Sequence, residues 1–340
     1  MKTEDLNIAL IGVGRIGRLH AEHLAYRIPA ANLVAIADVS EKAAKACATR
    51  LGVPCAVADY HELLARSDIQ AVVICSPTDT HARIVEEAAL AGKHIFCEKP
   101  IDLNIKKVDK ALAAVEKAGV KLQIGFNRRF DANFSRVRQA IRDGEIGTPQ
   151  LLHIISRDPG PPPIAYVKVS GGMFMDMTIH DFDMARFLIG SEVAEIYAAA
   201  AVTVDPAIGE AGDIDTAVIT LKFDNGVIGT IDNCRKAVYG YDQRVEILGS
   251  EGKIETDNRY PNQAIVSSGK SVYKDLPLNF FMERYTESFA AELLSFTQSV
   301  LENRQTAVTG IDGRIPVVMA MAARKSYDER RPVRLEEVEA

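Results

Sequence analysis

The sequence predicts an α/β protein with two domains. The N-terminal domain is predicted to be a doubly wound parallel sheet, and the C-terminal domain an α+β fold on a large, open, mostly antiparallel sheet. Short apolar runs alternate with helical patterns in the first part of the chain, and Gly-Glu-Ile-Gly-Thr-Pro then breaks this alternation. Strand-like segments follow one another from residue 193 onward. We therefore assign residues 1–146 to the first domain and 147–340 to the second.

Composition limits the class of protein. The 340 residues are 47% hydrophobic and 25% charged, and the formal net charge is -6. This negative balance argues against nucleic acid as a partner, because phosphate binding needs a concentrated basic surface. The five cysteines form no C-x-x-C or Cys/His pattern, so we expect no metal site and a reducing cytoplasmic location. There is no signal-peptide pattern and no run of about 18 apolar residues, so we expect no membrane association.

The first strand-to-helix connection carries a glycine motif. Apolar residues 6–11 enter Gly12-Val13-Gly14-Arg15-Ile16-Gly17, and a helical pattern follows. This order of elements places a helix N-terminus against a pyrophosphate. A second strand ends at Asp38, about 20 residues later, where a carboxylate can bind both hydroxyls of an adenosine ribose. Asp38 would repel a 2'-phosphate, so the sequence favours NAD over NADP and a Rossmann fold. The alternative is a glycine-rich turn in another α/β protein.

Polar residues also follow two later strands. The apolar run 71–75 ends in Ser76-Pro77-Thr78-Asp79-Thr80-His81, at the edge where open α/β sheets bind their ligands. Thr78 or Thr80 could instead simply cap the next helix. Strand 94–97 delivers Glu98-Lys99-Pro100. A lysine at a strand end beside a nicotinamide can stabilise a developing alkoxide, although a lysine before a proline can also be an ordinary surface turn.

The second half begins with a strand pattern at 150–157 and a proline-rich loop at 158–163. A largely apolar helix pattern, 173–188, then carries Asp176, His180 and Asp183 as a polar stripe. Asp176 and His180 are four residues apart, so on an α-helix they lie side by side as a proton-handling pair. The alternative is a solvated helix face. The remaining predicted elements are strands at 194–204, 213–223, 227–235, 243–248 and 253–256, a hairpin turn at 224–226, and closing helices at 281–302 and 312–328.

These motifs, taken in order, resemble the glucose-fructose oxidoreductase/inositol dehydrogenase/MocA family. The resemblance rests on the three glycines, on Glu98-Lys99-Pro100 and on Gly171-Gly172 leading into Asp176-x-x-x-His180-x-x-Asp183. It spans nearly the whole chain. Within the family, Arg157-Asp158 and the run from Tyr239 to Arg244 look most like inositol 2-dehydrogenases. The loop 158–165 departs from that pattern, because its three successive prolines and Ile164-Ala165 offer few hydrogen bonds.

The resemblance implies roles for particular residues. It makes Lys99, Asp176 and His180 the catalytic set, with the peptide bond before Pro100 in the cis form. His180 is then the base that takes the hydroxyl proton, because an imidazole has an unperturbed pKa near about 6.5. The residues implied in cofactor binding are Gly12, Gly14, Arg15, Ile16, Gly17, Asp38, Ser76, Thr78, His81, Glu98 and Lys99. Those implied in substrate binding are Lys99, Arg129, Asp158, Asp176, His180 and Tyr239.

The function expected from the sequence is NAD-dependent oxidation of a secondary hydroxyl of a cyclic polyol, with myo-inositol converted to its 2-keto product. The main alternative is an NAD(P)-dependent aldose or ketose dehydrogenase with the same catalytic residues. Two less favoured alternatives are a non-catalytic NAD-sensing protein and an enzyme that cleaves glycosides through transient oxidation. The resemblance also implies a homotetramer formed through open sheet faces. The inositol isomer or sugar, the physiological direction and the exact oligomer number stay open.

Overall fold

The computed structural model describes residues 5–338, which form two compact units. Unit 1 runs to Asn127 and also contains Glu287–Val317, whereas unit 2 comprises Arg128–Thr286 and resumes at Val318. These limits differ from the division at residues 146 and 147 expected from the sequence. Helix α6 (Ala132–Arg142), expected in the first domain, belongs to unit 2, where it packs against residues 179–189. The segment Glu287–Val317, expected in the second domain, belongs to unit 1. Such a return leaves no local sequence pattern.

Unit 1 is built on a six-stranded sheet in the order β3-β2-β1-β4-β5-β6, in which neighbouring strands are parallel. The strands are β1 (Leu6–Ile11), β2 (Ala31–Ala37), β3 (Cys55–Val57), β4 (Ala71–Ile74), β5 (His94–Glu98) and β6 (Leu122–Gly125). The central residues of β1, β4, β5 and β6 are fully buried, as expected for parallel strands covered on both faces, whereas the edge strand β3 is only partly buried. This confirms the predicted doubly wound sheet. The strand order reverses between β1 and β4, the point at which such sheets bind ligands.

The helices of unit 1 are α1 (Arg15–Tyr26), α2 (Glu41–Leu51), α3 (His61–Leu64), α4 (Thr78–Leu90), α5 (Ile105–Ala118) and α11 (Thr286–Leu301). Local sequence sets several of their ends. Helices α2 and α5 begin after side-chain caps from Ser40 and Asn104, and each ends at a left-handed glycine. Helix α11 contributes Leu293 and Phe296 to the same hydrophobic core as β1 and β5. The first sheet therefore depends on a helix that begins far along the chain.

Unit 2 is built on a seven-stranded sheet in the order β12-β11-β7-β10-β9-β8-β15. Its strands are β7 (Pro149–Arg157), β8 (Val193–Ala201), β9 (Thr216–Phe223), β10 (Ile228–Cys234), β11 (Asp242–Gly249), β12 (Lys253–Glu255) and β15 (Val333–Arg334). Its strand pairs are antiparallel except for β7 and β10. The predicted open, mostly antiparallel sheet is thus confirmed. Buried and exposed residues alternate along β9, so one face packs inward and the other stays open.

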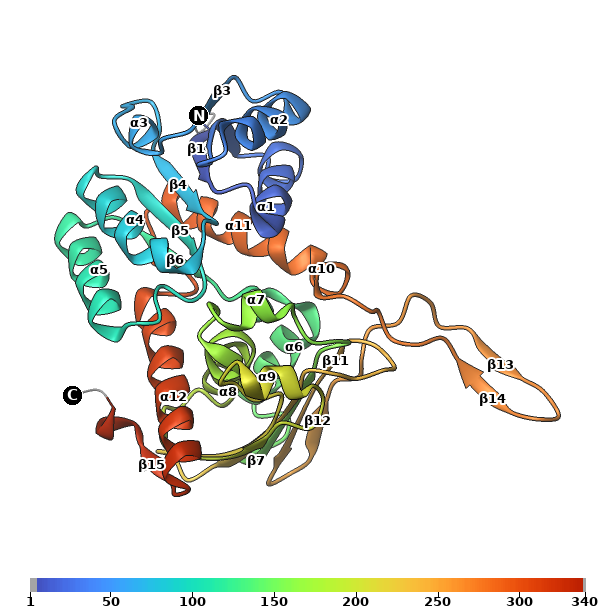
Figure 1. The fold of residues 1–340 in the computed structure, drawn as a ribbon. Helices are drawn as coiled ribbons and strands as arrows, with labels where there is room; N and C mark the ends of the chain where they lie inside the picture. Colours follow the sequence, from blue (N-terminus) through green and yellow to red (C-terminus); the bar gives the residue numbers. More distant parts are fainter. Residues whose placement is uncertain (1–4, 339–340) are drawn as a thin grey trace. The chain divides into compact units, whose positions relative to one another are not determined.

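Helices cover the inner face of this second sheet (Figure 1). The helices of unit 2 are α6, α7 (Ile164–Val167), α8 (Ile179–Ile189), α9 (Pro206–Glu210), α10 (Phe281–Arg284) and much of α12 (Gly310–Glu329), with the shorter turns η1 (Asn127–Phe130), η2 (Phe174–Thr178) and η3 (Leu335–Glu337). The closing helix expected over 281–302 is in fact two helices, α10 and α11. Helix α12 begins in unit 1 and ends in unit 2. No helix in the described part of the chain is long and apolar enough to cross a membrane.

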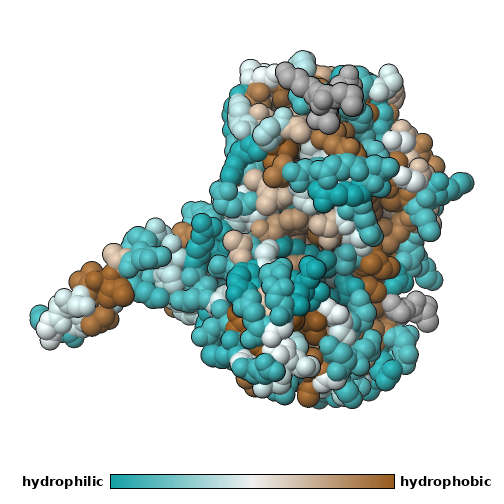
Figure 2. Space-filling view, turned by 180° about the vertical axis from the view of Figure 1, so that it is seen from behind, coloured by the Kyte–Doolittle hydropathy of each residue, from teal (hydrophilic) through white to brown (hydrophobic). Residues whose placement is uncertain are grey.

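A hairpin absent from the sequence prediction, β13 (Ile265–Ser267) with β14 (Val272–Lys274), extends away from the sheet of unit 2 (Figure 1). Hydrophobic side chains gather on it (Figure 2), with Ile265 65% and Val272 70% exposed. Each strand has only three residues, which is too short for an alternating pattern to be recognised. That is why the sequence did not reveal the hairpin.

Candidate active site

The glycine loop of unit 1 leaves no room for side chains at two of its three glycines. Gly12 has a φ of +95°, and a Cβ there would lie 2.6 Å from the Ser76 amide nitrogen. A Cβ on Gly17 would lie 1.9 Å from the Gly12 carbonyl oxygen. Nothing lies within 4 Å of the position of a Cβ on Gly14. The first and third glycines are therefore required by the fold, and the second leaves open space at the start of α1, as close approach of a pyrophosphate requires.

Asp38 is tied to this loop. Its Oδ2 accepts a 2.8 Å hydrogen bond from the Val13 amide, and its Oδ1 accepts one of 2.9 Å from the Ser40 amide. An ionised carboxylate has about four acceptor positions, so each oxygen can also accept a ribose hydroxyl. The loop, the helix N-terminus and this carboxylate together fit the pyrophosphate and adenosine ribose of NAD. Arg15 and Ile16 are the first residues of α1 beside Gly14.

The polar residues after β4 join the same edge of the sheet. His81 is buried, and its two ring nitrogens lie 2.7 Å from the Ser76 carbonyl oxygen and 2.8 Å from that of Pro100. It thereby links the ends of β4 and β5. Thr78 does not cap α4, which has Pro77 at its N-cap and no side-chain cap, and Thr80 donates to the Pro77 carbonyl. Capping therefore does not account for Thr78, and its role in cofactor binding stays a prediction.

Glu98 and Lys99 follow β5 on this edge. The Lys99-Pro100 bond is cis, as the resemblance implied. The Glu98 carboxylate lies 2.6 Å from His20 Nε2. It also lies against β6 where Gly125 leaves room, because a Cβ there would be 3.1 Å from the Glu98 carboxyl carbon. The predicted cofactor residues of unit 1 thus lie along a single sheet edge, linked by contacts from Asp38 to Pro100.

Asp176 and His180 belong to unit 2, on the junction of η2 and α8. Gly172, at a φ of +79°, admits the Asp213 carboxylate, which accepts a 3.1 Å hydrogen bond from the Met173 amide as the helix begins. Residues 174–178 are π-helical rather than α-helical. The turn that leads from Asp176 to His180 is therefore wider than the α-helical turn assumed from the sequence, and the pairing of the two side chains stays a prediction. Turns of this kind are frequent at functional sites.

Arg235 holds Asp176, and the sequence did not single it out. Its Nη1 donates to Asp176 Oδ2 at 3.0 Å and lies 3.8 Å from Asp158 Oδ2. The Arg235 side chain is 2% exposed, and its Nε and Nη2 have no hydrogen-bond acceptor. The Tyr166 hydroxyl donates to Asp176 Oδ1 at 2.9 Å. The only signal for Arg235 was a charged residue at the end of an apolar strand.

Asp158 is a predicted substrate residue, and it lies near Arg235 within unit 2. Burial raises its pKa to about 6, while the charge of Arg235 opposes the rise and the charge of Asp176 adds to it. Its side chain is 25% exposed. The structure thus brings Asp158, Asp176 and Arg235 together as a group of two carboxylates around one guanidinium. The carboxylates of such a group can accept hydrogen bonds from neighbouring hydroxyls of one ligand.

A network of buried hydrogen bonds holds the backbone that carries Asp176 and His180. Arg128 Nη1 donates to Asp181 Oδ1 at 2.6 Å, and Asn233 Nδ2 donates to Asp181 Oδ2 at 2.9 Å. The Thr178 hydroxyl donates to Asn233 Oδ1 at 2.6 Å. These side chains are almost entirely buried, so each partner prevents the cost of an unpaired buried charge. The contacts fix η2 and the start of α8 on β10.

Asp183 is fully buried rather than part of an exposed or cleft-facing stripe. Arg129 Nη2 donates to Asp183 Oδ1 at 2.6 Å, and Arg129 Nε lies 2.9 Å from Oδ2. The expected polar stripe is therefore wrong at Asp183, because α8 turns this carboxylate toward η1. The contact of Arg129 with substrate stays a prediction, and its guanidinium has a structural partner.

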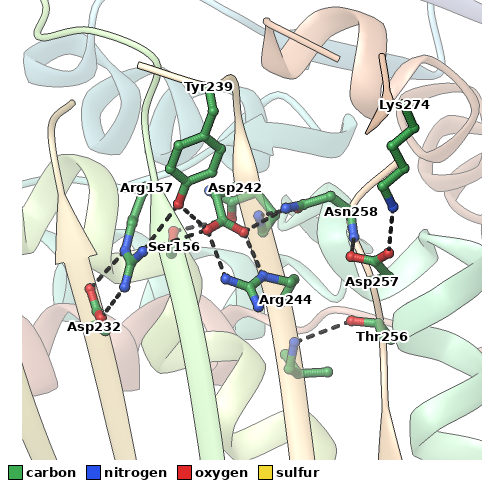
Figure 3. Close-up of polar contacts among 12 residues, drawn as sticks. Ser156, Arg157, Asp232, Tyr239, Asp242, Arg244, Thr256, Asp257, Asn258 and Lys274 are labelled. Carbon is green, nitrogen blue, oxygen red and sulfur yellow. Dashed lines mark hydrogen bonds and ion pairs between the residues drawn. The ribbon is translucent and has the colours of Figure 1, made fainter. Parts of the chain in front are cut away.

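Tyr239 takes part in a network on the β7 and β11 strands (Figure 3). Its hydroxyl donates to Asp242 Oδ2 at 2.6 Å and accepts from Arg157 Nη1 at 3.1 Å. Asp242 also accepts from Arg244 and Asn258. Burial raises the pKa of Asp242, but these hydrogen bonds outweigh it and lower the pKa below its usual value. The Tyr239 hydroxyl is thus held by two partners, and its contact with substrate stays a prediction.

The fold and the residues of the two units define a class, the NAD-dependent oxidoreductases with a Rossmann unit and a second, α+β unit. Residues 6–126 match the model of the oxidoreductase family with an NAD-binding Rossmann fold, and residues 134–255 match the GFO/IDH/MocA C-terminal domain. The chain belongs to the GFO/IDH/MocA oxidoreductase family, as the sequence motifs indicated, and its cofactor is NAD.

Characterised relatives are similar over their full length. The myo-inositol 2-dehydrogenase of Thermotoga maritima is 48% identical over 98% of this chain and 99% of its own. The inositol 2-dehydrogenase of Rhizobium meliloti is 46% identical over 96% of this chain and 98% of its own. The crystal structure of scyllo-inositol dehydrogenase from Lactobacillus casei, with bound NAD(H) and scyllo-inositol, gives a TM-score of 0.92 at 29% identity, covering 98% of this chain and 100% of that one.

Proposed function

We propose that the protein is an NAD-dependent inositol 2-dehydrogenase that oxidises one secondary hydroxyl of myo-inositol to a ketone. The observation that carries the proposal is the 48% identity, over nearly the full length of both chains, to a myo-inositol 2-dehydrogenase. The geometry supports it, because unit 1 fits NAD and unit 2 groups two carboxylates and a guanidinium beside η2 and α8. Polyhydroxylated ligands need many such partners, since each unmatched buried polar group costs about 1–3 kcal/mol.

Oxidation of the alcohol removes a proton from oxygen and a hydride from the same carbon. Bound NAD supplies the nicotinamide that accepts the hydride. In this proposal His180 takes the hydroxyl proton as general base, and Asp176 stabilises the protonated ring. Tyr166 and Arg235 hold the Asp176 carboxylate in place. Lys99 donates a hydrogen bond to the reacting oxygen, so its charge stabilises the developing alkoxide.

Substrate hydroxyls other than the reacting one bind to Asp158 in this proposal, because its side chain is 25% exposed. Arg235 is only 2% exposed, so it acts by holding the Asp176 carboxylate and by lying near that of Asp158. Arg129 and Tyr239 remain substrate candidates. Because the side chains of both already have protein partners, we place them second to Asp158.

Two observations keep other substrates in view. The Lactobacillus casei structure contains scyllo-inositol, which differs from myo-inositol in the configuration of a hydroxyl. The loop 158–165 contains few side chains that can bind a hydroxyl. We therefore retain scyllo-inositol and, after it, an aldose or ketose as alternative substrates for the same catalytic residues.

The experiment that tests the proposal is NADH formation by the purified protein, followed by absorbance at alkaline pH. Myo-inositol, scyllo-inositol, D-chiro-inositol and glucose are offered separately with NAD. We expect the highest kcat/KM with myo-inositol. A preference for another isomer or for glucose would reassign the substrate, and no turnover with any polyol would favour the non-catalytic NAD-binding alternative.

His180→Ala tests the assignment of the base. We expect turnover to fall roughly 10²- to 10⁴-fold, the usual contribution of a general base, while NADH binding measured by fluorescence is retained. His153→Ala is the matched control, because His153 is an exposed histidine of unit 2 that lies beside Thr230 on the sheet. Wild-type turnover in His180→Ala would show that another group takes the proton.

We further infer a homotetramer in the cytoplasm. The open face of the unit 2 sheet carries half-exposed apolar residues, including Tyr197, Val218, Ile228 and Leu248, and burial of such a face stabilises an oligomer. All five cysteines are free thiols, as expected in a reducing compartment. Light scattering tests the assembly, and a stable monomer would contradict it.

A further inference from the structure

Unit 1 contains a cluster of three titratable side chains, of which only Glu98 has a predicted role, in cofactor binding. His20 comes from α1, Glu98 from the end of β5 and Glu292 from α11. His20 and Glu292 are fully buried, and the Glu98 side chain is 12% exposed. His20 Nε2 lies 2.6 Å from Glu98 Oε1 and 3.9 Å from Glu292 Oε1. The three thus form a buried trio that reaches the surface only at Glu98.

The two carboxyl groups of the trio differ in their surroundings. Among the residues that the structure describes, neither oxygen of Glu292 has a hydrogen-bond partner, and His20 Nε2 lies 3.9 Å from Oε1. Burial, and then the charge of Glu98, raise the pKa of Glu292 well above its usual value. A lone buried carboxylate takes up a proton because the charged form cannot be solvated. Glu98, by contrast, accepts a hydrogen bond from an imidazole.

The surrounding groups are neutral. Burial raises the pKa of the Cys75 and Cys97 thiols well above their usual value. Burial and the charge of His20 lower the pKa of His23 to about 4. Strand β6 also packs here and contributes Gln123, whose Nε2 donates to the Glu292 carbonyl oxygen.

A shared metal ion would be the other way to satisfy these groups. Their ligand atoms all lie within 4.8 Å of one another. However, two atoms bound tetrahedrally to one zinc ion are about 3.3 Å apart, whereas His20 Nε2 and Glu98 Oε1 are separated by 2.6 Å. That separation is the length of a charge-assisted hydrogen bond. The geometry favours a proton over a metal.

We propose that Glu292 is a buried, protonated acid that lies against His20, that His20 holds the Glu98 carboxylate in place, and that the three side chains thereby position Lys99. The absence of a side chain at Gly125 fits this role, since it leaves room for the carboxylate on β6. Lys99 is the next residue after Glu98, so a shift of the carboxylate moves the lysine backbone. The trio consists of positioning residues, and the inference rests on the proposed role of Lys99 at the reacting oxygen.

The first test detects the proton on the Glu292 carboxyl group and needs no substrate. Infrared difference spectra of the full-length wild type and Glu292→Gln should show a carbonyl band of a protonated carboxylic acid at neutral pH that the variant lacks. Metal analysis of the same preparations accompanies the spectra. Absence of the band, or one equivalent of metal in the wild type that is lost in the variant, would overturn the proposal. A wrong substrate assignment would leave the band unaffected.

The second test separates positioning from packing. Glu292→Gln keeps a neutral hydrogen-bonding group and should retain kcat within about twofold. Glu292→Leu has a similar volume, so it should not destabilise the fold, but kcat should fall roughly 10- to 100-fold because misplaced reacting groups cost about that much. Thr297→Val, a buried substitution on the same helix, is the control. Wild-type kcat in Glu292→Leu would refute a positioning role.

Discussion

The cofactor loop of unit 1 and the carboxylate group of unit 2 are built in opposite ways. The loop functions through its backbone, with two glycines that admit no Cβ, a third beside open space, and Asp38 held by main-chain amides. The unit 2 group functions through side chains that meet from distant elements, as Arg235 meets Asp176 59 residues away in sequence. A backbone site tolerates little change at its glycines. A site built from charged side chains instead depends on keeping each charge paired, because a buried charge that loses its partner is destabilising.

Of the substitutions that test this comparison, Arg235→Met should reduce activity most. It removes the guanidinium from two carboxylates, and breaking a buried ion pair by removing one partner costs about 3–5 kcal/mol. We expect kcat/KM for the polyol to fall about 10²- to 10³-fold, with unchanged NADH binding. Arg186→Met is the control, because Arg186 pairs with Glu192 rather than with the site. A variant with near wild-type kcat/KM would show that Asp176 needs no partner.

Asp158→Asn should change stability in a pH-dependent manner. The raised pKa of about 6 means that the folded protein holds this proton after the unfolded chain, with a carboxyl pKa near 3.8, has released it. Stability of the wild type is therefore lost as pH rises from about 4 to about 6, by about 1–3 kcal/mol for a group that is partly exposed. Asp158→Asn should not show this decrease in stability. Urea unfolding at about pH 4 and about pH 8 measures the unfolding free energies of both proteins.

One outcome would contradict the raised pKa of Asp158. If the difference in unfolding free energy between variant and wild type is the same at both pH values, Asp158 is ionised throughout, and its ion pair with Arg235 outweighs its burial.

Gly14→Ala should have the smallest effect and isolates the backbone site. Apart from its chain neighbours, none of the residues that the structure describes has an atom within 4 Å of the new Cβ, so the melting temperature should stay the same. The Kd of NADH should rise about tenfold, equivalent to about 1.4 kcal/mol, because a methyl group stands where the pyrophosphate approaches. Gly160→Ala, which also has open space, is the control in unit 2. Unchanged NADH binding in Gly14→Ala would place the pyrophosphate elsewhere.

The comparison also explains what the sequence could reveal. The doubly wound sheet, the glycine loop and Asp38 were predictable because fixed spacing and residue type encode them locally. The open sheet of unit 2 was predictable from alternation and from the turn at Gly226. Arg235, Tyr166 and the Arg129 pair with Asp183 were not, because their partners are set by tertiary packing. The π-helical turn was missed because no residue type is specific for it.

The return of α11 to unit 1 has a consequence for synthesis on the ribosome. Leu293 and Phe296 complete the core around β1 and β5, yet they are translated only after nearly all of unit 2. The first domain to emerge thus cannot complete its core until α11 has been made, although domains commonly fold in order during translation. A nascent chain that stops before α11 exposes one side of a hydrophobic sheet, which makes it a substrate for chaperones and proteases.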